Sequence, residues 1–241
     1  MTIKMKYLKR ILHAPQGTPN VAVLIELGVK PITQEIHTRQ LNFLHHILTM
    51  EKNDPVRKIY DQQKKFQFEK TWYNEVKNLL KMYSLEYDEG AISELKKETW
   101  KRIVKKQVCT YTMNQFNNEC KEKKKTRSVP CQNKIRCKEY MLRMTPQEAR
   151  MFFKVRVNIV DLRAVRDYMY DEKVCRLCGQ EKEDVNHVLN ECEEVTRTSR
   201  ISDEDIHKEK DVETKKEVVR RVIEFQNKVK EKERKVSESP D

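Results

Sequence analysis

Apolar residues recur every three or four positions along most of the chain, which is the spacing of one face of an α-helix. The clearest stripe lies between residues 32 and 48, and similar stripes occupy residues 21–27, 72–80, 92–108, 149–157 and 218–229. The pattern therefore predicts an all-α fold in which helices are joined by short polar loops.

Helix boundaries are marked by a few strong local signals. Thr145-Pro146-Gln147-Glu148 has the form of a capping box with proline at the first helical position, and Thr71 can cap a helix that begins at Trp72. Gly28 is expected to end the helix that follows Pro19. The chain has only four Gly and seven Pro, too few for an all-β fold with many tight turns.

Positive charge is concentrated in one part of the chain. The formal net charge is +12, and residues 96–138 hold fourteen Lys or Arg against three Glu, a balance of +11. On the helix predicted over 92–108 the apolar side chains share one side and the lysines the other. The alternative is a helix face that is simply exposed to solvent, but such a face usually carries acidic residues that pair with the lysines, and acidic residues are scarce here. We therefore expect contacts with nucleic-acid phosphates, which attract such clusters through counterion release. The expected contacts are Lys97, Lys101, Arg102 and Lys105, together with Arg176.

A metal site is the sharpest chemical signal. Cys175 and Cys178 are separated by two residues, eight residues separate Cys178 from His187, and four separate His187 from Cys192. Two cysteines at this spacing can turn both thiolates onto one ion, and Gly179 eases the backbone through the turn. Three thiolates and one imidazole form a closed shell, which predicts one structural zinc ion. The alternatives are unrelated free cysteines or a redox pair, and the latter lacks its strand–helix context.

Other residues able to bind metals or bases are read as structural. Cys109, Cys120, Cys131 and Cys137 lie eleven, eleven and six positions apart, a spacing that matches no zinc module. His45 and His46 are adjacent and cannot easily share an ion. The tryptophans, Trp72 and Trp100, are expected in the core, whereas Tyr111 is a candidate for stacking on a base.

Motifs of catalysis and of membrane insertion are missing from the sequence. There is no glycine-rich phosphate loop, no Gly-x-Ser-x-Gly, no His-Glu-x-x-His and no pair of adjacent aspartates, so we predict no enzyme activity and no catalytic residue. No run of 18 apolar residues is present, and residues 1–6 lack the apolar core of a signal peptide. With seven cysteines, an odd number, we expect an intracellular protein, nuclear or cytoplasmic.

Four segments are predicted. Residues 1–130 form a helical region that contains the basic helix and ends near the loop at 128–130, and residues 131–170 form a helical linker. Residues 171–195 form a zinc knuckle, the small module that carries the four predicted metal ligands, and residues 196–241 form a charged tail. From residue 193 onward thirteen basic and fourteen acidic side chains nearly balance. We expect a lone charged helix there, with Val218, Val222, Phe225 and Val229 as its apolar stripe, and a disordered end over 237–241.

Three stretches together resemble the C-terminal part of a non-LTR retrotransposon reverse transcriptase. They are the segments beginning MKYLKRILHAPQGTPN, YMLRMTPQEARMFFKV and CRLCGQEKEDVNHVLNEC, which span roughly residues 1–192 in the order of that family. The resemblance implies a thumb, a helical linker and a terminal CCHC knuckle that grip template RNA and target DNA. The fingers and the palm with its catalytic aspartates are absent, so it implies a truncated product or a fragment that cannot copy RNA by itself.

Three functional hypotheses follow. The favoured one is a module that binds RNA or DNA through the basic stretch and the zinc knuckle. In the second, the knuckle only staples the fold and the helix over 210–236 pairs with a protein partner. In the third, the chain is a functionless remnant that folds poorly, which a flat thermal melt in the presence of zinc would reveal.

Overall fold

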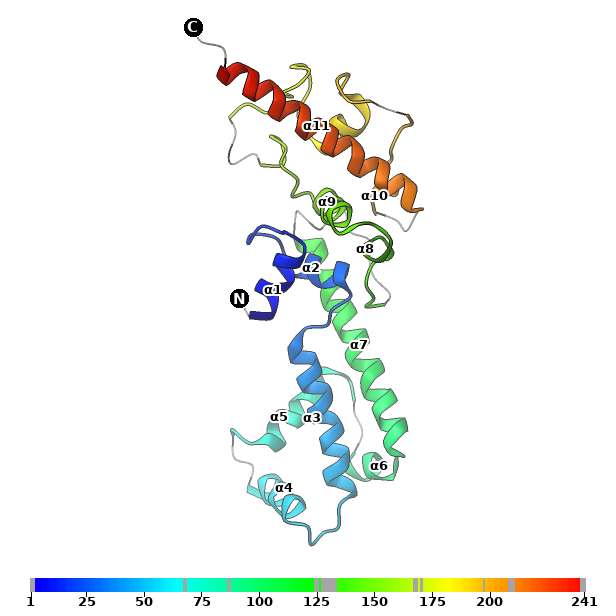
Figure 1. Ribbon diagram of the computed structural model, residues 1–241. Helices are drawn as coiled ribbons and strands as arrows, with labels where there is room; N and C mark the ends of the chain where they lie inside the picture. The colour runs from blue at the N-terminus through cyan, green and yellow to red at the C-terminus, as the bar shows by residue number, and fades with distance from the viewer. Residues whose placement is uncertain are drawn as a thin grey trace. The chain divides into compact units, whose positions relative to one another are not determined.

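The computed structural model describes residues 3–66, 69–85, 88–123, 126, 134–166, 169, 171–196, 198–207 and 211–238. Within these ranges the chain forms twelve helices and no strand, and the all-α prediction is confirmed (Figure 1). A single antiparallel bridge, between Val174 and Lys182, is the only β-type pairing in the described part. No helix in these ranges combines the length and apolar character needed to cross a lipid bilayer.

The chain divides into two compact units, which are described separately. Unit 2 comprises Lys30–Asn117 and Asn133–Ile135, and unit 1 comprises Met1–Val29, Asn118–Gln132 and Arg136–Asp241. Helix α7 (Lys97–Glu122) contributes residues to both. The four segments predicted from the sequence rest on composition and motifs, and that division stays a prediction.

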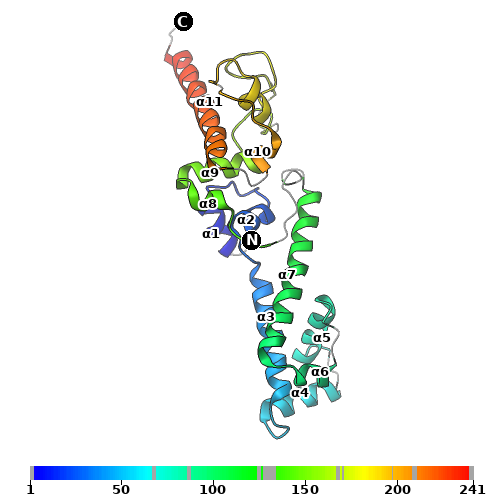
Figure 2. The same ribbon diagram turned by 90° about the vertical axis from the view of Figure 1, so that its right-hand side faces the viewer.

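Unit 2 is built around two long helices, α3 (Ile32–Thr49) and the first part of α7, which lie side by side in both views (Figures 1 and 2). The shorter helices α4 (Pro55–Phe66), α5 (Trp72–Met82) and α6 (Glu89–Glu94) pack against α3 or against each other. Trp100 is fully buried between the long helices, and its Nε1 donates to the carbonyl of Leu41 at 2.9 Å. The expected core position of this tryptophan is confirmed.

The single basic helix predicted over 92–108 is in fact two. Helix α6 ends at Glu94, Leu95 is extended with φ −70° and ψ 139°, and α7 begins at Lys97. His45 on α3 explains the break, because its Nε2 donates to the carbonyl of Leu95 at 2.8 Å. Gly90 lies within α6, behind the capping residue Asp88. The apolar spacing runs through both helices and could not reveal the break.

Unit 1 has seven helices within the described residues. They are α1 (Ile3–Ile11), α2 (Asn20–Leu27), α8 (Glu139–Arg143), α9 (Pro146–Arg156), the single π-helical turn η2 (His187–Glu191), α10 (Asp203–His207) and α11 (Val212–Glu238). Helix α11, drawn in red and orange, lies against α8, α9, α10 and η2 (Figures 1 and 2). Phe152 of α9 and Phe225 of α11 are fully buried in the shared core.

Helix α11 corrects the expectation of a lone charged tail. Its apolar stripe, Val218, Val222, Phe225 and Val229, is 0–3% exposed inside the core of unit 1. The near-balanced charges do not prevent this packing, because most charged side chains of α11 lie away from the apolar stripe, and only Lys215 and Arg221 are buried. Ser237 and Glu238, expected to be disordered, belong to α11, and residues 239–241 lie outside the described ranges.

The predicted helix caps are confirmed. Thr145 accepts the N–H of Glu148 at 3.4 Å, and the Glu148 carboxylate accepts the N–H of Thr145 at 2.9 Å, which is a complete capping box. Thr71 accepts the N–H of Asn74 at the start of α5. Gly28 ends α2 in the left-handed conformation, with φ 63°. A Cβ at Gly28 would lie 2.0 Å from the nitrogen of Cys137, so only glycine fits this close approach.

A buried ionic cluster connects four helices of unit 1. The Arg156 guanidinium donates to one oxygen of Glu26 at 2.7 Å, and the Tyr140 hydroxyl donates to the other at 2.8 Å. Arg156 also donates to the carbonyls of Ile206 and His207 at the end of α10. Since Glu26 is 0% and Arg156 3% exposed, their mutual pairing is what makes the burial of both charges tolerable.

Candidate functional site

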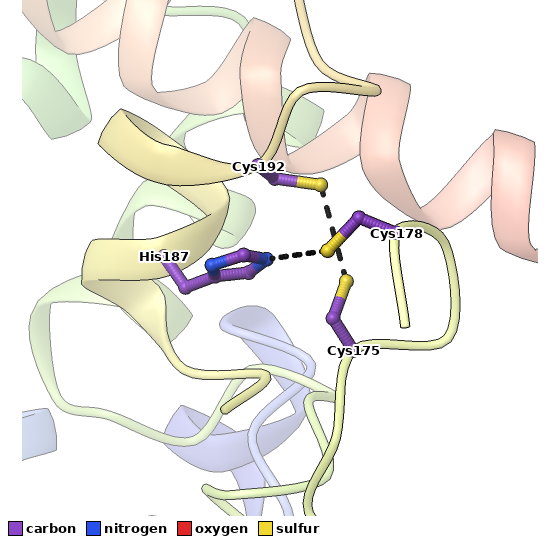
Figure 3. Close-up of side chains that lie close together, drawn as sticks. All are labelled: Cys175, Cys178, His187 and Cys192. Carbon is purple, nitrogen blue, oxygen red and sulfur yellow. Dashed lines mark hydrogen bonds between the residues drawn. The ribbon is translucent and has the colours of Figure 1, made fainter. Parts of the chain in front are cut away.

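The four predicted metal ligands converge on one point in unit 1 (Figure 3). Cys175 and Cys178 come from the turn that precedes η2, His187 from η2 itself and Cys192 from the residue that ends it. Their ligand atoms all lie within 4.8 Å of one another. These side chains can hold one metal ion, and the described residues contain no second cluster of this kind.

The spacing of the ligand atoms suits a tetrahedral ion. Cys175 Sγ lies 3.9 Å from Cys192 Sγ, and Cys178 Sγ lies 3.4 Å from His187 Nε2. With the usual zinc–sulfur and zinc–nitrogen bond lengths, a tetrahedral shell requires about 3.8 Å and about 3.6 Å for these pairs. The cluster also matches zinc in its chemistry, because three thiols and an imidazole are soft, nitrogen- and sulfur-bearing ligands.

A short hairpin places the first two cysteines. Cys175 donates its N–H to the carbonyl of Glu181 at 2.8 Å, and Glu183 donates to the carbonyl of Lys173 at 2.8 Å. Between these paired segments the chain turns through Gly179, which adopts a left-handed φ of 71°. The turn therefore brings both thiols to the same side of the hairpin, as the two-residue spacing predicted.

A widened helical turn places the other two ligands. Cys192 donates its N–H to the carbonyl of His187, five residues back, at 2.8 Å. In a regular α-helix, residues five apart face different directions, whereas the wider π-type turn brings them closer to one side. Asp184 starts this turn by accepting the N–H of His187 at 3.0 Å. The four-residue gap between His187 and Cys192 thus becomes compatible with a shared ion.

The three thiols differ in how readily they lose a proton. Burial raises the pKa of Cys175, and burial raises that of Cys192 to about 12. Burial alone would also raise the pKa of Cys178, but hydrogen bonds from the N–H groups of Gln180 and Glu181 and from the neighbouring thiols outweigh it and lower that pKa. Cys178 is therefore the first thiolate to form, and a bound cation would stabilise the other two.

Glu191 stands beside the imidazole. Nδ1 of His187 is buried and lies 3.7 Å from the Glu191 carboxylate, just beyond hydrogen-bond distance. Metal-binding histidines usually donate their second ring N–H to such a group, which fixes the tautomer that leaves the other nitrogen free for the ion. A small rotation of the half-exposed Glu191 side chain would complete this contact.

Glu183 and Arg176 form a buried ion pair behind the metal ligands. The Arg176 guanidinium donates to the Glu183 carboxylate at 2.7 Å, and Glu183 also accepts the N–H groups of Arg163 and Arg176. Glu183 is 0% exposed, so its carboxylate is held entirely by these partners. Arg176, one of the predicted phosphate contacts, is committed to this pair and reaches Glu233 of α11 at 3.5 Å.

Helix α11 holds the knuckle against the rest of unit 1. The fully buried Arg221 donates to the carbonyl of Leu189 at 2.7 Å, and Lys232 donates to the carbonyls of Arg176 and Leu177 at 2.9 and 3.1 Å. Cys175, Leu189 and Cys192 also share one apolar core with α9 and α11. The knuckle is accordingly an integral part of unit 1 and has no core separate from it.

The other predicted phosphate contacts lie on α7 in unit 2. Lys97, Arg102 and Lys105 are exposed, and the partly exposed Lys101 pairs with Glu98 at 2.9 Å. Lys97 and Lys101 also line a pocket of about 310 Å³ against α3, where Asn42, His46 and Thr49 form its other wall. Sequence spacing indicated the row of cations but not this pocket, which needs the packing of α3 on α7.

The remaining thiols and aromatic residues fit structural roles where they are described. Cys109 and Cys120 lie on α7 and Cys137 lies near α2, and none of the three forms a disulfide. Cys131 lies outside the described residues. Tyr111, considered for stacking on a base, is half-buried and makes an edge-to-face contact with Tyr83. Trp72 is partly buried against the core of unit 2.

Comparison of the chain with protein-family models, with curated proteins and with solved structures finds no match.

Proposed function

We propose that the chain is a nucleic-acid-binding module whose knuckle is stabilised by one structural zinc ion. The row of cations on α7 carries this proposal. Lys97, Lys101 and Lys105 follow each other at four-residue intervals, or roughly 6 Å along the helix axis. Arg102 is exposed beside them. Such a row attracts a phosphate backbone and releases its counterions.

The pocket between α3 and α7 supports the same interpretation. Lys97 and Lys101 stand at its edge, and the amide of Asn42 and the ring of His46 offer hydrogen-bonding groups beside them. The ion pair between Lys101 and Glu98 is exposed, so it contributes little free energy and a phosphate can displace it. A single strand could therefore place a phosphate on the lysines and a base edge near the polar groups of α3.

We assign the zinc a structural role. Three thiolates and one imidazole close a four-coordinate shell, and no position is left for a water molecule or a substrate. The contacts of Arg221 and Lys232 with the knuckle backbone suit a metal that holds unit 1 together. This interpretation leaves the module without an enzyme activity of its own.

Descent from the C-terminal region of a non-LTR retrotransposon reverse transcriptase is part of the proposal. It is supported by the three resembling sequence stretches and by the presence of the knuckle ligands in one cluster. The second hypothesis, a protein partner on the helix over 210–236, is less favoured. The apolar stripe of α11 that such a partner would use is already buried by unit 1.

Binding of single-stranded RNA and DNA as a function of salt tests the proposal. The zinc-loaded chain is titrated against labelled oligonucleotides, and the slope of log affinity against log salt is measured. Substitution of four cations on α7 should lower that slope by about one unit per lost phosphate contact. The test variant carries Lys97→Gln, Lys101→Gln, Arg102→Gln and Lys105→Gln.

A second variant of equal charge serves as the control. It loses four exposed lysines elsewhere, so any difference between the two variants reports position and not net charge. The control should keep most of the parental slope. An equal loss of slope in both variants, or a parental affinity that does not depend on salt, would contradict the proposed interface. The control carries Lys6→Gln, Lys52→Gln, Lys58→Gln and Lys81→Gln.

A further inference from the structure

Unit 1 contains a second pocket, of about 470 Å³, that the proposed interface does not use. Its walls come from α9, from α11 and from two segments that follow helix ends. Residues 13–15 follow α1 and Ile159 follows α9, and in each case the chain turns through a left-handed residue, His13 or Asn158. The volume lies in the range of about 300–1,000 Å³ that is usual for sites of small organic ligands.

Two lysines give the pocket a positive side. Lys154 of α9 is partly buried on one wall, and Lys230 of α11 is exposed on the other. Burial lowers the pKa of Lys154, and the nearby cations Arg166 and Arg150 lower it further, while Asp161 opposes them. A partly buried cation with cationic neighbours is unfavourable unless an anion approaches it.

The acidic side chains of the pocket have arginine partners. Asp161 pairs with Arg166 at 3.2 Å, and Glu233 pairs with Arg176 at 3.5 Å. Among the described residues no carboxylate oxygen lies within ion-pair distance of the Lys154 or Lys230 ammonium group. The two lysines therefore remain as donors for a ligand.

Part of the remaining pocket lining is apolar, and His13 and Gln226 add polar side chains to it. Met151 and the buried Ile159 line it from the α9 side, and Val229 lines it from α11. A small inorganic anion would contact the lysines and leave this apolar surface uncovered. A ligand that fills the pocket thus combines a negative group with an organic body.

We propose that this pocket binds a phosphate group carried by an organic molecule, such as a nucleotide, with Lys154 and Lys230 contacting the phosphate oxygens. The phosphate belongs either to a free nucleotide or to a nucleic-acid strand, and the chemistry of the contact is the same. The site goes beyond the interface proposed on α7, because it lies in the other unit and shares none of its residues.

Calorimetric titration of the zinc-loaded full chain with adenosine monophosphate, adenosine and inorganic phosphate tests this site. Adenosine monophosphate should bind at least about tenfold more tightly than adenosine, since a charged hydrogen bond accounts for that much. Lys154→Met, which keeps an apolar stem but removes the charge, should weaken the nucleotide by at least about tenfold. Equal binding of adenosine and its monophosphate would overturn the proposal.

Two further variants separate the loss of a phosphate contact from a loss of folding or of net charge. Lys230→Met changes an exposed side chain, so the fold is not at risk, and it should also weaken adenosine monophosphate. Lys58→Met removes an exposed lysine of α4 in unit 2 and should leave nucleotide binding unchanged. Parental affinity in both Lys154→Met and Lys230→Met, or an equal loss in Lys58→Met, would refute the site.

The source of the phosphate is assigned by repeating the RNA titration with Lys154→Met. For a phosphate within a strand, the salt slope falls by about one unit and adenosine monophosphate competes with RNA. For a free nucleotide, RNA affinity is unchanged while nucleotide binding is lost. If the α7 interface proves wrong, these nucleotide measurements are unaffected, so the two proposals are tested independently.

Discussion

At the scale of single residues, buried charges in this protein hold the backbone in place. Glu26, Arg156, Glu183 and Arg221 are at most 3% exposed, and each has charged or carbonyl partners within hydrogen-bond distance. Removal of one member of such a group leaves the other charged and buried, which costs far more than the loss of an exposed pair. The knuckle depends on two sets of side chains, the four candidate metal ligands and the buried ion pair of Arg176 and Glu183.

Cys192→Ser should remove the metal. Serine cannot supply the soft thiolate, and the remaining three ligands leave the shell open. We expect about one zinc ion per parental chain and little in the variant, with a fall in the free energy of unfolding of roughly 3 kcal/mol or more. Metal analysis of the purified proteins and urea unfolding measure both. Cys109→Ser, outside the cluster, should retain its zinc, and a parent that folds without zinc would contradict the site.

Arg176→Met tests whether this arginine stabilises the knuckle or contacts phosphate. Because Glu183 would be left buried without its guanidinium, we expect a loss of about 3–5 kcal/mol in the free energy of unfolding. Lys101→Met, which breaks an exposed pair, should cost no more than about 1 kcal/mol. Chemical denaturation compares the two. A small effect of Arg176→Met on stability together with a lower RNA salt slope would favour the phosphate contact.

At the scale of elements, α11 organises unit 1 through one apolar face and one charged row. The apolar face enters the core, while Glu217 accepts hydrogen bonds from Arg220 and Arg221 at 2.7 Å each. Arg221 in turn donates to the carbonyl of Leu189, beside the candidate metal ligands. The helix therefore couples its own ion pairs to the position of η2.

Glu217 should make the stability of unit 1 depend on pH. Hydrogen bonds from Arg220, and then those from Arg221, lower the pKa of Glu217 to about 2. A lowered folded-state pKa stabilises the fold above the unfolded pKa of about 4.3, and that contribution is lost as the pH falls through about 2. Urea unfolding of parent and Glu217→Gln at pH 6 and at pH 3 should show a smaller difference at the lower pH. A difference that is constant with pH would contradict this assignment.

At the scale of the whole molecule, the described residues include two separate hydrophobic cores. One contains the knuckle, α9 and α11, and the other contains α3, α5 and the start of α7. Both tryptophans of the protein, Trp72 and Trp100, belong to unit 2. Tryptophan fluorescence therefore reports on unit 2, whereas circular dichroism reports on the helices of both units.

Zinc removal should affect the two units unequally. We expect a chelator to lower the midpoint of the thermal transition seen by circular dichroism, because the metal ligands belong to the core of unit 1. The transition seen by tryptophan fluorescence should change little. Two signals that shift together by the same amount would instead show that the units unfold as one.

The sequence alone determined those features that depend on neighbouring residues. Apolar spacing located the long helices, Thr145 and Glu148 defined a capping box, and the spacing of three cysteines and one histidine defined the metal ligands. In each case the groups lie within a few residues or within one short hairpin. Local backbone geometry then suffices to bring them together.

Only the tertiary structure decided which distant groups meet. Glu26 was the one charged residue in an apolar helix, a signal of burial, but its partner Arg156 lies 130 positions away. The end of α6 depends on His45, and the place of α11 depends on the core that covers its stripe. The pocket of Lys154 and Lys230 likewise arises where α9 and α11 pack. These contacts close long loops, and their geometry is set by packing across the whole unit, which the local pattern does not encode.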